Sequence, residues 1–159
     1  MEAREKKILK ALSLELRHLL EGQYDSAGHW HAGDLEQRLN AIGVWRERTM
    51  PADEMHLSPD DSRARSVVDA YLKLRDEAGV RLADAVAEFV RETAYTWANR
   101  LLALRCMEAR ELIDEVILQK EVYGGRSLEH HRLIQRQPEL GTGEDDGLFA
   151  ALEAAFARQ

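Results

Sequence analysis

The chain has 159 residues, of which 45% are hydrophobic and 32% charged, as is ordinary for a soluble, helix-rich domain with a core of its own. Its net charge of −7 disfavours a dedicated nucleic-acid binder, because phosphate contacts need clustered Lys and Arg. Cys106 is the single cysteine, which excludes an internal disulfide and favours a reducing, cytoplasmic location. The apolar runs are too short to span a bilayer, and the N-terminus does not read as a secretory signal, so no membrane partner is expected.

The N-terminal part of the chain predicts two helices separated by a loop. Leucines and isoleucine recur at three- and four-residue spacing over residues 2–21, and Gly22 stands where a C-terminal cap belongs. Residues 23–33, rich in small and polar side chains, are expected to form a loop. Asp34 is the predicted N-cap of a short second helix, and residues 44–57 are interpreted as a connector.

The middle of the chain predicts two further helices, one of them long. Ser58 and Pro59 provide a serine cap followed by proline at the first helical position, and this helix is expected to run to Gly79. The next helix should be the spine of the fold, over residues 82–113, with Cys106 as a small buried thiol. An apolar stripe marks its inner face: Leu82, Val86, Phe89, Val90, Trp97, Leu101, Leu104 and Met107.

The C-terminal part predicts one short helix and an amphipathic last segment. Ser127 should cap the first and Pro138 should end it. Asp145 or Asp146 is the expected cap of the last, amphipathic segment. The only strand candidate is the apolar piece at residues 116–118.

Together these elements predict an all-α, single-domain bundle of about five helices around one long central helix. Residues 1–159 form one helical module in this prediction. Within it, residues 1–57 hold the N-terminal helices and connector, 58–123 the helical core, and 124–159 the C-terminal helices.

No catalytic, cofactor or metal site can be argued from spacing. Metal ligands on a helix usually recur at three or four residues, whereas His130 and His131 are adjacent, and the loop pair His29 and His31 has no cysteine nearby. The glycines at 141–143 lie among acidic residues that would repel phosphate. We therefore expect catalytic residues, cofactor-binding residues and metal ligands all to be absent.

The charged and polar residues suggest contact surfaces instead. Residues 1–20 carry five basic side chains against three acidic ones, while residues 51–78 carry seven acidic against four basic, and 139–153 carry five acidic and no basic. Polar residues also interrupt the apolar long helix. Buried groups there would need partners in neighbouring helices, in another domain or in nucleic acid, and the remaining alternative is that these residues face solvent. The candidate DNA or partner contacts are Arg4, Lys6, Lys7, Lys10, Arg17, Asn99 and Arg100.

A family resemblance rests on the run AYTWANRLLALRCMEARELI at residues 94–113. Its matching positions are Tyr95, Thr96, Trp97, Asn99, Arg100, Ala103, Leu104, Arg105, Met107 and Glu108. The run resembles the helical region near the N-terminus of large phage-defence adenine-specific DNA methyltransferases of the BREX (Pgl) and DISARM type. The segments VYGGRSLEHHRL and GEDDGLFAAL are similar to that family as well.

The resemblance implies methyl transfer from SAM to adenine N6, but not by residues of this chain. That chemistry needs a glycine-containing SAM loop and an Asn-Pro-Pro-Tyr or Asn-Pro-Pro-Phe motif that holds the flipped base. The three prolines here follow Met50, Ser58 and Gln137, so neither motif is present. SAM is implied only for a separate parent domain, and the chain is expected to be the segment before that domain or a stand-alone relative of it.

The predicted role is therefore a non-catalytic accessory module that positions DNA or docks on the catalytic methyltransferase domain or on other defence-system proteins. Two alternatives remain open. One is a weak DNA-binding domain that uses the basic residues of 1–20. The other is a stand-alone protein-interaction or inhibitory module whose acidic segments, 51–78 and 139–153, imitate DNA.

Overall fold

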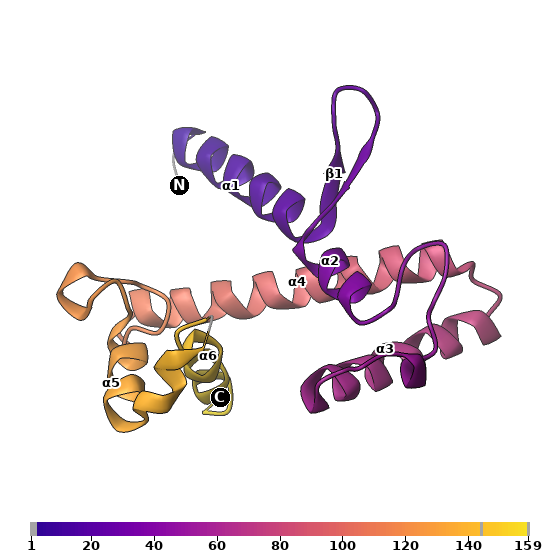
Figure 1. The fold of residues 1–159 in the computed structure, drawn as a ribbon. Helices are drawn as coiled ribbons and strands as arrows, with labels where there is room; N and C mark the ends of the chain where they lie inside the picture. The colour runs from indigo at the N-terminus through magenta and orange to yellow at the C-terminus, as the bar shows by residue number, and fades with distance from the viewer. Residues whose placement is uncertain (1–2, 144, 159) are drawn as a thin grey trace. The chain divides into compact units, whose positions relative to one another are not determined.

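The computed structural model describes residues 3–143 and 145–158, apart from the side chains of residues 3–6, 8 and 9. The chain forms two compact units, Met1–Thr96 and Trp97–Gln159, which are described separately. Across the described residues it has six α-helices, three short 3₁₀ turns and one small two-stranded sheet, which confirms the predicted all-α class (Figure 1). None of the described helices is both long and apolar enough to cross a bilayer. The single-module boundaries stay a prediction.

The first unit contains α1, a hairpin, α2, α3 and the first half of α4. Their bounds are α1 Ala3–Glu21, β1 Gly22–Tyr24, β2 Trp30–Ala32, α2 Asp34–Ala41, a 3₁₀ turn Ala52–Glu54, α3 Pro59–Glu77 and α4 Leu82–Ala109. The predicted start of α3 is confirmed, because the Ser58 hydroxyl accepts the Asp61 N–H at 3.1 Å. The predicted cap at Asp34 is wrong. Asp34 is the first residue of α2, and the capping position is Gly33, which has no side chain to bond.

The segment expected to be a loop at residues 23–33 is an antiparallel hairpin instead. Tyr24 pairs with Trp30, and Gly22 pairs with Ala32 at its base. The Asp25 carboxylate closes the turn by accepting the backbone N–H groups of Ala27 and His29, each at 2.9 Å. Strands of three residues are too short to show the period-two alternation by which strands are recognised, so the sequence carried little signal for this element.

The core of the first unit joins α2, α3 and α4. Its buried apolar residues are Leu39, Ile42, Val44, Val68, Leu72, Ala85, Val86 and Val90. Arg65 of α3 is also buried, and its guanidinium donates to the carbonyls of Ile42 at 2.7 Å and Met50 at 2.8 Å. These bonds satisfy backbone carbonyls that would otherwise lack partners, so Arg65 fastens the start of the 44–57 connector onto α3.

The second unit contains the second half of α4 with α5 and α6. Their bounds are α5 Leu128–Arg136, α6 Leu148–Phe156, and 3₁₀ turns Glu121–Tyr123 and Pro138–Thr142. The Ser127 cap is confirmed by its bond from the His130 N–H at 3.3 Å, and α5 ends before Pro138 as predicted. Gly147 occupies the capping position of α6, but the Asp145 carboxylate accepts the Phe149 N–H at 2.9 Å and so serves the first turn.

Aromatic and aliphatic side chains from α4 and α6 form the core of the second unit. Leu104 and Val116 are almost fully buried beside Leu152. The Trp97 ring meets Phe149 and Phe156 edge to face, at centroid distances of 5.6 and 5.9 Å. Such pairs add to the stabilisation that burial alone provides.

Two expectations about the second unit are wrong. Residues 116–118 form no strand; the buried Glu108 carboxylate instead accepts the N–H groups of Val116 and Ile117. Cys106 is exposed rather than buried. It lies on the side of α4 that carries Asn99 and Leu102, which are also exposed, whereas Leu104 and Glu108 face the core.

Candidate nucleic-acid and partner interface

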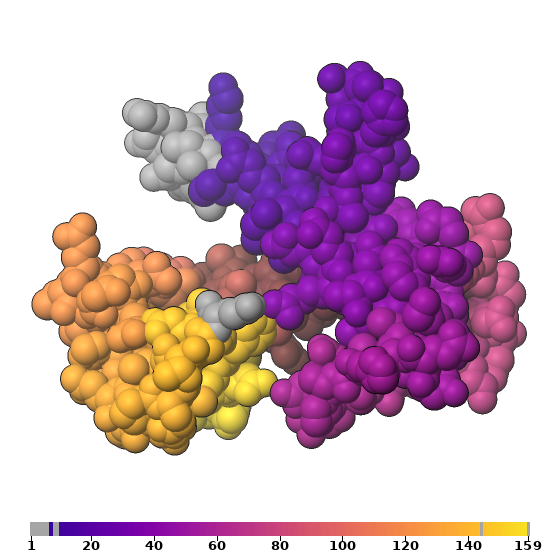
Figure 2. Space-filling model, viewed as in Figure 1, coloured from indigo at the N-terminus to yellow at the C-terminus, as the bar shows by residue number. Residues whose placement is uncertain are grey.

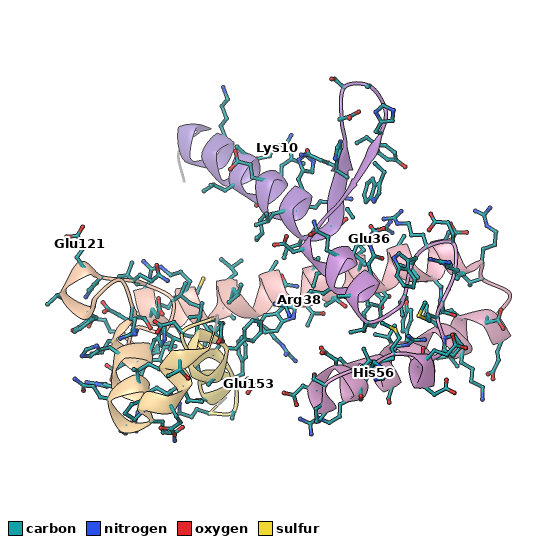
Figure 3. The ribbon with its side chains drawn as sticks, in the orientation of Figure 1. Lys10, Glu36, Arg38, His56, Glu121 and Glu153 are labelled. Carbon is teal, nitrogen blue, oxygen red and sulfur yellow. The ribbon has the colours of Figure 1, made fainter. Side chains whose placement is uncertain are left out.

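The predicted contact residues fall into two groups in the structure. Arg4 and Lys6 belong to α1, but their side chains lie outside the described residues. Lys7, Lys10 and Arg17 are exposed on the same helix, where Lys10 is labelled in Figure 3.

Asn99 and Arg100 belong to the second unit, and both are exposed on α4. Their contact with DNA or a partner therefore stays a prediction. The Arg100 guanidinium lies over the Phe156 ring at 5.5 Å, and this contact gives it a structural role within its own unit.

Helix α1 presents two different faces. At 100° per residue, Lys7, Lys10 and Arg17 fall within about 80° of one another. Leu12, Leu16 and Leu19 fall within about 60° on the opposite side, and this group is called the α1 apolar face below. All three leucines are exposed, so α1 offers both a basic and an apolar surface.

A cleft of about 490 Å³ lies where the end of α1 meets the hairpin and α4. It is called the hairpin cleft below. Three arginines, two aromatic residues and the glutamate that pairs with Arg17 are among its lining residues. They are Arg17, Glu21, Tyr24, Trp30, Arg46 and Arg91. The hairpin that forms one wall projects from the surface of the first unit (Figure 2).

Glu36 positions two of the lining side chains. Its buried carboxylate accepts two bonds from the Arg46 guanidinium, both at 2.7 Å, and one from the Trp30 indole N–H at 3.0 Å. Figure 3 shows Glu36 near the junction of α1, the hairpin and α2. The Arg46 guanidinium also lies 4.4 Å from the Trp30 ring centroid. A buried carboxylate with charge-assisted bonds holds both groups in fixed positions.

The groups left free in the cleft are a tyrosine ring and a cation. Tyr24 meets Trp30 edge to face at 4.9 Å, and 67% of the tyrosine remains exposed. Arg91 is exposed, and it has no hydrogen bond or ion pair with any side chain among the described residues. Three arginines line the cleft against the carboxylates of Glu21 and Glu36, so the local charge is positive on a protein whose net charge is −7.

The histidines flanking Trp30 both contact the carboxylate that closes the hairpin turn. His31 Nε2 lies 3.0 Å and His29 Nδ1 3.4 Å from the Asp25 carboxylate. The hydrogen bond with the His31 side chain, followed by that from the His29 N–H, lowers the pKa of Asp25 to about 2. Within the described part of the chain, no three His, Cys, Asp or Glu side chains are grouped to hold a metal ion.

Sequence reasoning missed most of the cleft. The sequence predicts a loop around Tyr24 and Trp30, and nothing in it links Glu36 to Arg46, ten positions away. Arg91 was visible only as one of several arginines along the long helix. The one usable signal was the pair of aromatic residues inside an otherwise small and polar segment.

Comparison with known proteins gives one match. The chain is 22% identical, over an alignment of 188 positions, to the adenine-specific methyltransferase PglX of Lacticaseibacillus casei (strain Zhang). The alignment covers 98% of this chain but only 14% of that methyltransferase. No family model and no solved structure matches the chain. The similarity suggests that the chain and one region of a much longer methyltransferase are related.

Proposed function

We propose that this chain is a non-catalytic helical module that works with an adenine-specific DNA methyltransferase of a phage-defence system by docking on its catalytic part. The similarity to one region of such an enzyme supports the association. The observation that supports docking is the exposed α1 apolar face. The sequence supports the non-catalytic role, because it has neither a SAM loop nor an Asn-Pro-Pro motif.

The α1 apolar face has the properties of a surface that is covered in use. Leu12, Leu16 and Leu19 are 54%, 38% and 59% exposed. A helix of this length is marginal in water unless its apolar side packs on something. Leucines that line up along one exposed face therefore favour a partner surface over a solvated one.

The size of the relative supports the occupant that we propose. The matched region makes up 14% of the methyltransferase, so most of that protein lies outside it and is available for contact. Within such a protein, the rest of the enzyme is the nearest surface that could cover an exposed apolar helix. We therefore assign the α1 apolar face to the catalytic part of the methyltransferase.

The DNA-mimic alternative has less support. A mimic needs carboxylates free to imitate phosphates, whereas several acidic groups of residues 51–78 and 139–153 are already bonded. Asp69 pairs with Arg65 at 2.8 Å, and Asp146 receives two bonds from Arg126 at 2.6 and 2.7 Å. The arginine lowers the pKa of Asp146, as expected for a carboxylate engaged within the fold.

Calorimetric titration of the chain with an adenine-specific methyltransferase similar to PglX tests the docking proposal. Leu16→Glu should weaken binding at least about tenfold, because it places a charge in an apolar contact. Leu14→Glu is the matched control, since Leu14 is 50% exposed on the same helix but about 160° from Leu16. It should leave the affinity within about twofold.

Two outcomes would contradict the proposal. Equal losses for Leu14→Glu and Leu16→Glu would show that the α1 apolar face is not the contact. Sedimentation of the chain alone gives the second: a dimer that Leu16→Glu dissociates, with methyltransferase binding unchanged, would assign the face to self-association.

A further inference from the structure

We infer that the hairpin cleft binds a short single-stranded segment of nucleic acid, with a base stacked on Tyr24 and the adjoining phosphate on Arg91 and Arg17. This inference concerns a different surface from the α1 apolar face and does not depend on docking. It rests on an exposed ring, an unpaired arginine beside a second, largely exposed one, and a cavity of suitable size, all brought together by one hairpin.

The stacking position is the Tyr24 ring. It stands at the end of β1, two-thirds exposed, and its contact with Trp30 fixes the direction of the ring. The Trp30 face is itself in contact with the Arg46 guanidinium, so the tyrosine is the ring with surface left for a ligand. Nucleic-acid bases stack on such rings whatever their sequence, because every base has a π face.

The phosphate position is formed by one arginine without an ion pair and by a second that stays largely exposed beside its ion-pair partner. Arg91 makes no side-chain bond within the described residues, and Arg17 bonds only Glu21, at 3.1 Å, while 60% of its side chain stays exposed. Lys10 and Lys7 continue from Arg17 along the same face of α1. A backbone leaving the cleft would therefore meet further positive charge for about three turns of helix.

The cleft has room for a nucleotide and is already formed. Its volume of about 490 Å³ lies within the range of pockets that hold small organic ligands. Glu36 holds Trp30 and Arg46 without any ligand, so little ordering is needed on binding. Preformed sites lose less free energy to ordering when they bind.

The same features distinguish a single strand from two other anionic partners. An acidic peptide would bind the arginines, but its carboxylates would gain no affinity from the exposed Tyr24 ring beside them. Duplex DNA keeps its bases stacked inside the helix, where Tyr24 cannot reach a base face. The combination of ring and cations is the one used by proteins that follow unpaired strands.

Fluorescence anisotropy with a labelled oligothymidine of about ten nucleotides tests the inference at low salt. Tyr24→Leu should weaken binding about tenfold and Tyr24→Phe should retain it, since the ring and not the hydroxyl makes the stack. Tyr95→Leu is the matched control, because Tyr95 is 70% exposed on α4 and does not line the cleft. It should bind like the unmodified chain.

The salt dependence tests the phosphate contact separately. Log affinity should fall with log salt with a slope of about −1.4 for the two arginines on a single strand, and Arg91→Ala should reduce the magnitude of that slope by about 0.7. Arg81→Ala, at an exposed arginine outside the cleft, should leave it unchanged. A change of slope reports a lost phosphate contact, which a merely structural substitution would not produce.

Each remaining outcome overturns the inference. Absence of oligothymidine binding at low salt, or equal losses for Tyr24→Leu and Tyr95→Leu, would remove the site. Full competition by a poly-glutamate peptide would assign the cleft to an acidic protein partner. If the chain bound duplex DNA and Tyr24→Leu did not weaken that binding, the cleft would contact phosphate without stacking a base on Tyr24. A chain that binds the methyltransferase but not oligothymidine would overturn only this inference.

Discussion

At the scale of single residues, Asp25 controls the hairpin turn through its charge. Its carboxylate accepts two backbone N–H groups and contacts two histidines, and its pKa is lowered from 3.8 to about 2. A carboxylate whose pKa is lower in the folded state stabilises that state above its unfolded pKa, and this stabilisation is lost as the pH falls through the folded value. The ionised Asp25 should therefore stabilise the hairpin fully above about pH 4 and progressively less towards pH 2.

Amide NMR signals of Ala27 and His29 provide the measurement, because both N–H groups donate to Asp25. We expect their chemical shifts to titrate together with an apparent pKa near 2. Asp25→Asn should abolish this titration while Gly79, in another turn, is unaffected. A midpoint near the ordinary aspartate value of 3.8 would show that the turn does not hold the carboxylate as described.

Glu36 shows what sequence reasoning cannot reach at this scale. A glutamate near a helix start is usually a solvent-facing residue, and its pattern gives no reason to expect burial. Only the folded chain brings Arg46 and the Trp30 indole to it. Cys106 shows the reverse error. A small thiol in an apolar stretch is usually buried, but the angular position of Cys106 around the helix places its side chain on the exposed side.

At the scale of elements, the hairpin depends on Gly22. Its φ of +103° suits glycine, and a Cβ there would lie 2.8 Å from both the Trp30 ring and the Gly33 nitrogen. Gly22→Ala should therefore cost more than the roughly 1–3 kcal/mol of backbone strain alone. It should also displace Trp30, and with it one wall of the hairpin cleft.

Gly28→Ala separates strain from crowding. Gly28 also has a positive φ, +84°, but a Cβ there would meet nothing within 4 Å. Urea unfolding should thus show a smaller loss of stability for Gly28→Ala, of about 1 kcal/mol, than for Gly22→Ala. Equal losses for the two variants would mean that the close approach between Gly22 and Gly33 does not matter.

The helices of this chain were predictable where local rules decide them. The Ser58–Pro59 start of α3, the Ser127 cap of α5 and the apolar stripe of α4 each follow from capping chemistry or helical periodicity. The hairpin was not predictable in this way. Its strands have three residues each, and its stability comes from a turn carboxylate and two glycines in close contact. Those terms depend on tertiary approach, which no local pattern reports.

At the scale of the whole molecule, the net charge and the local distribution of charge favour different conclusions about DNA binding. The net charge of −7 opposes general DNA binding, yet the first unit gathers arginines around the hairpin cleft. Composition alone cannot show this, because it averages over residues that folding brings together. In the proposed division of roles, this chain therefore binds nucleic acid and the methyltransferase, and the methyltransferase transfers the methyl group.

That division predicts the outcome of a methylation assay. Tritiated SAM and duplex DNA incubated with the purified chain should yield no methylated adenine, because the chain has no Asn-Pro-Pro motif to hold a flipped base. An adenine-specific methyltransferase similar to PglX should incorporate label, and adding the chain should raise that incorporation at limiting DNA. Leu16→Glu should remove the increase, whereas Leu14→Glu should preserve it, since only the first lies on the α1 apolar face. Label transferred by the chain alone would refute the non-catalytic role, and an unchanged rate in the mixture would show that docking does not serve methylation.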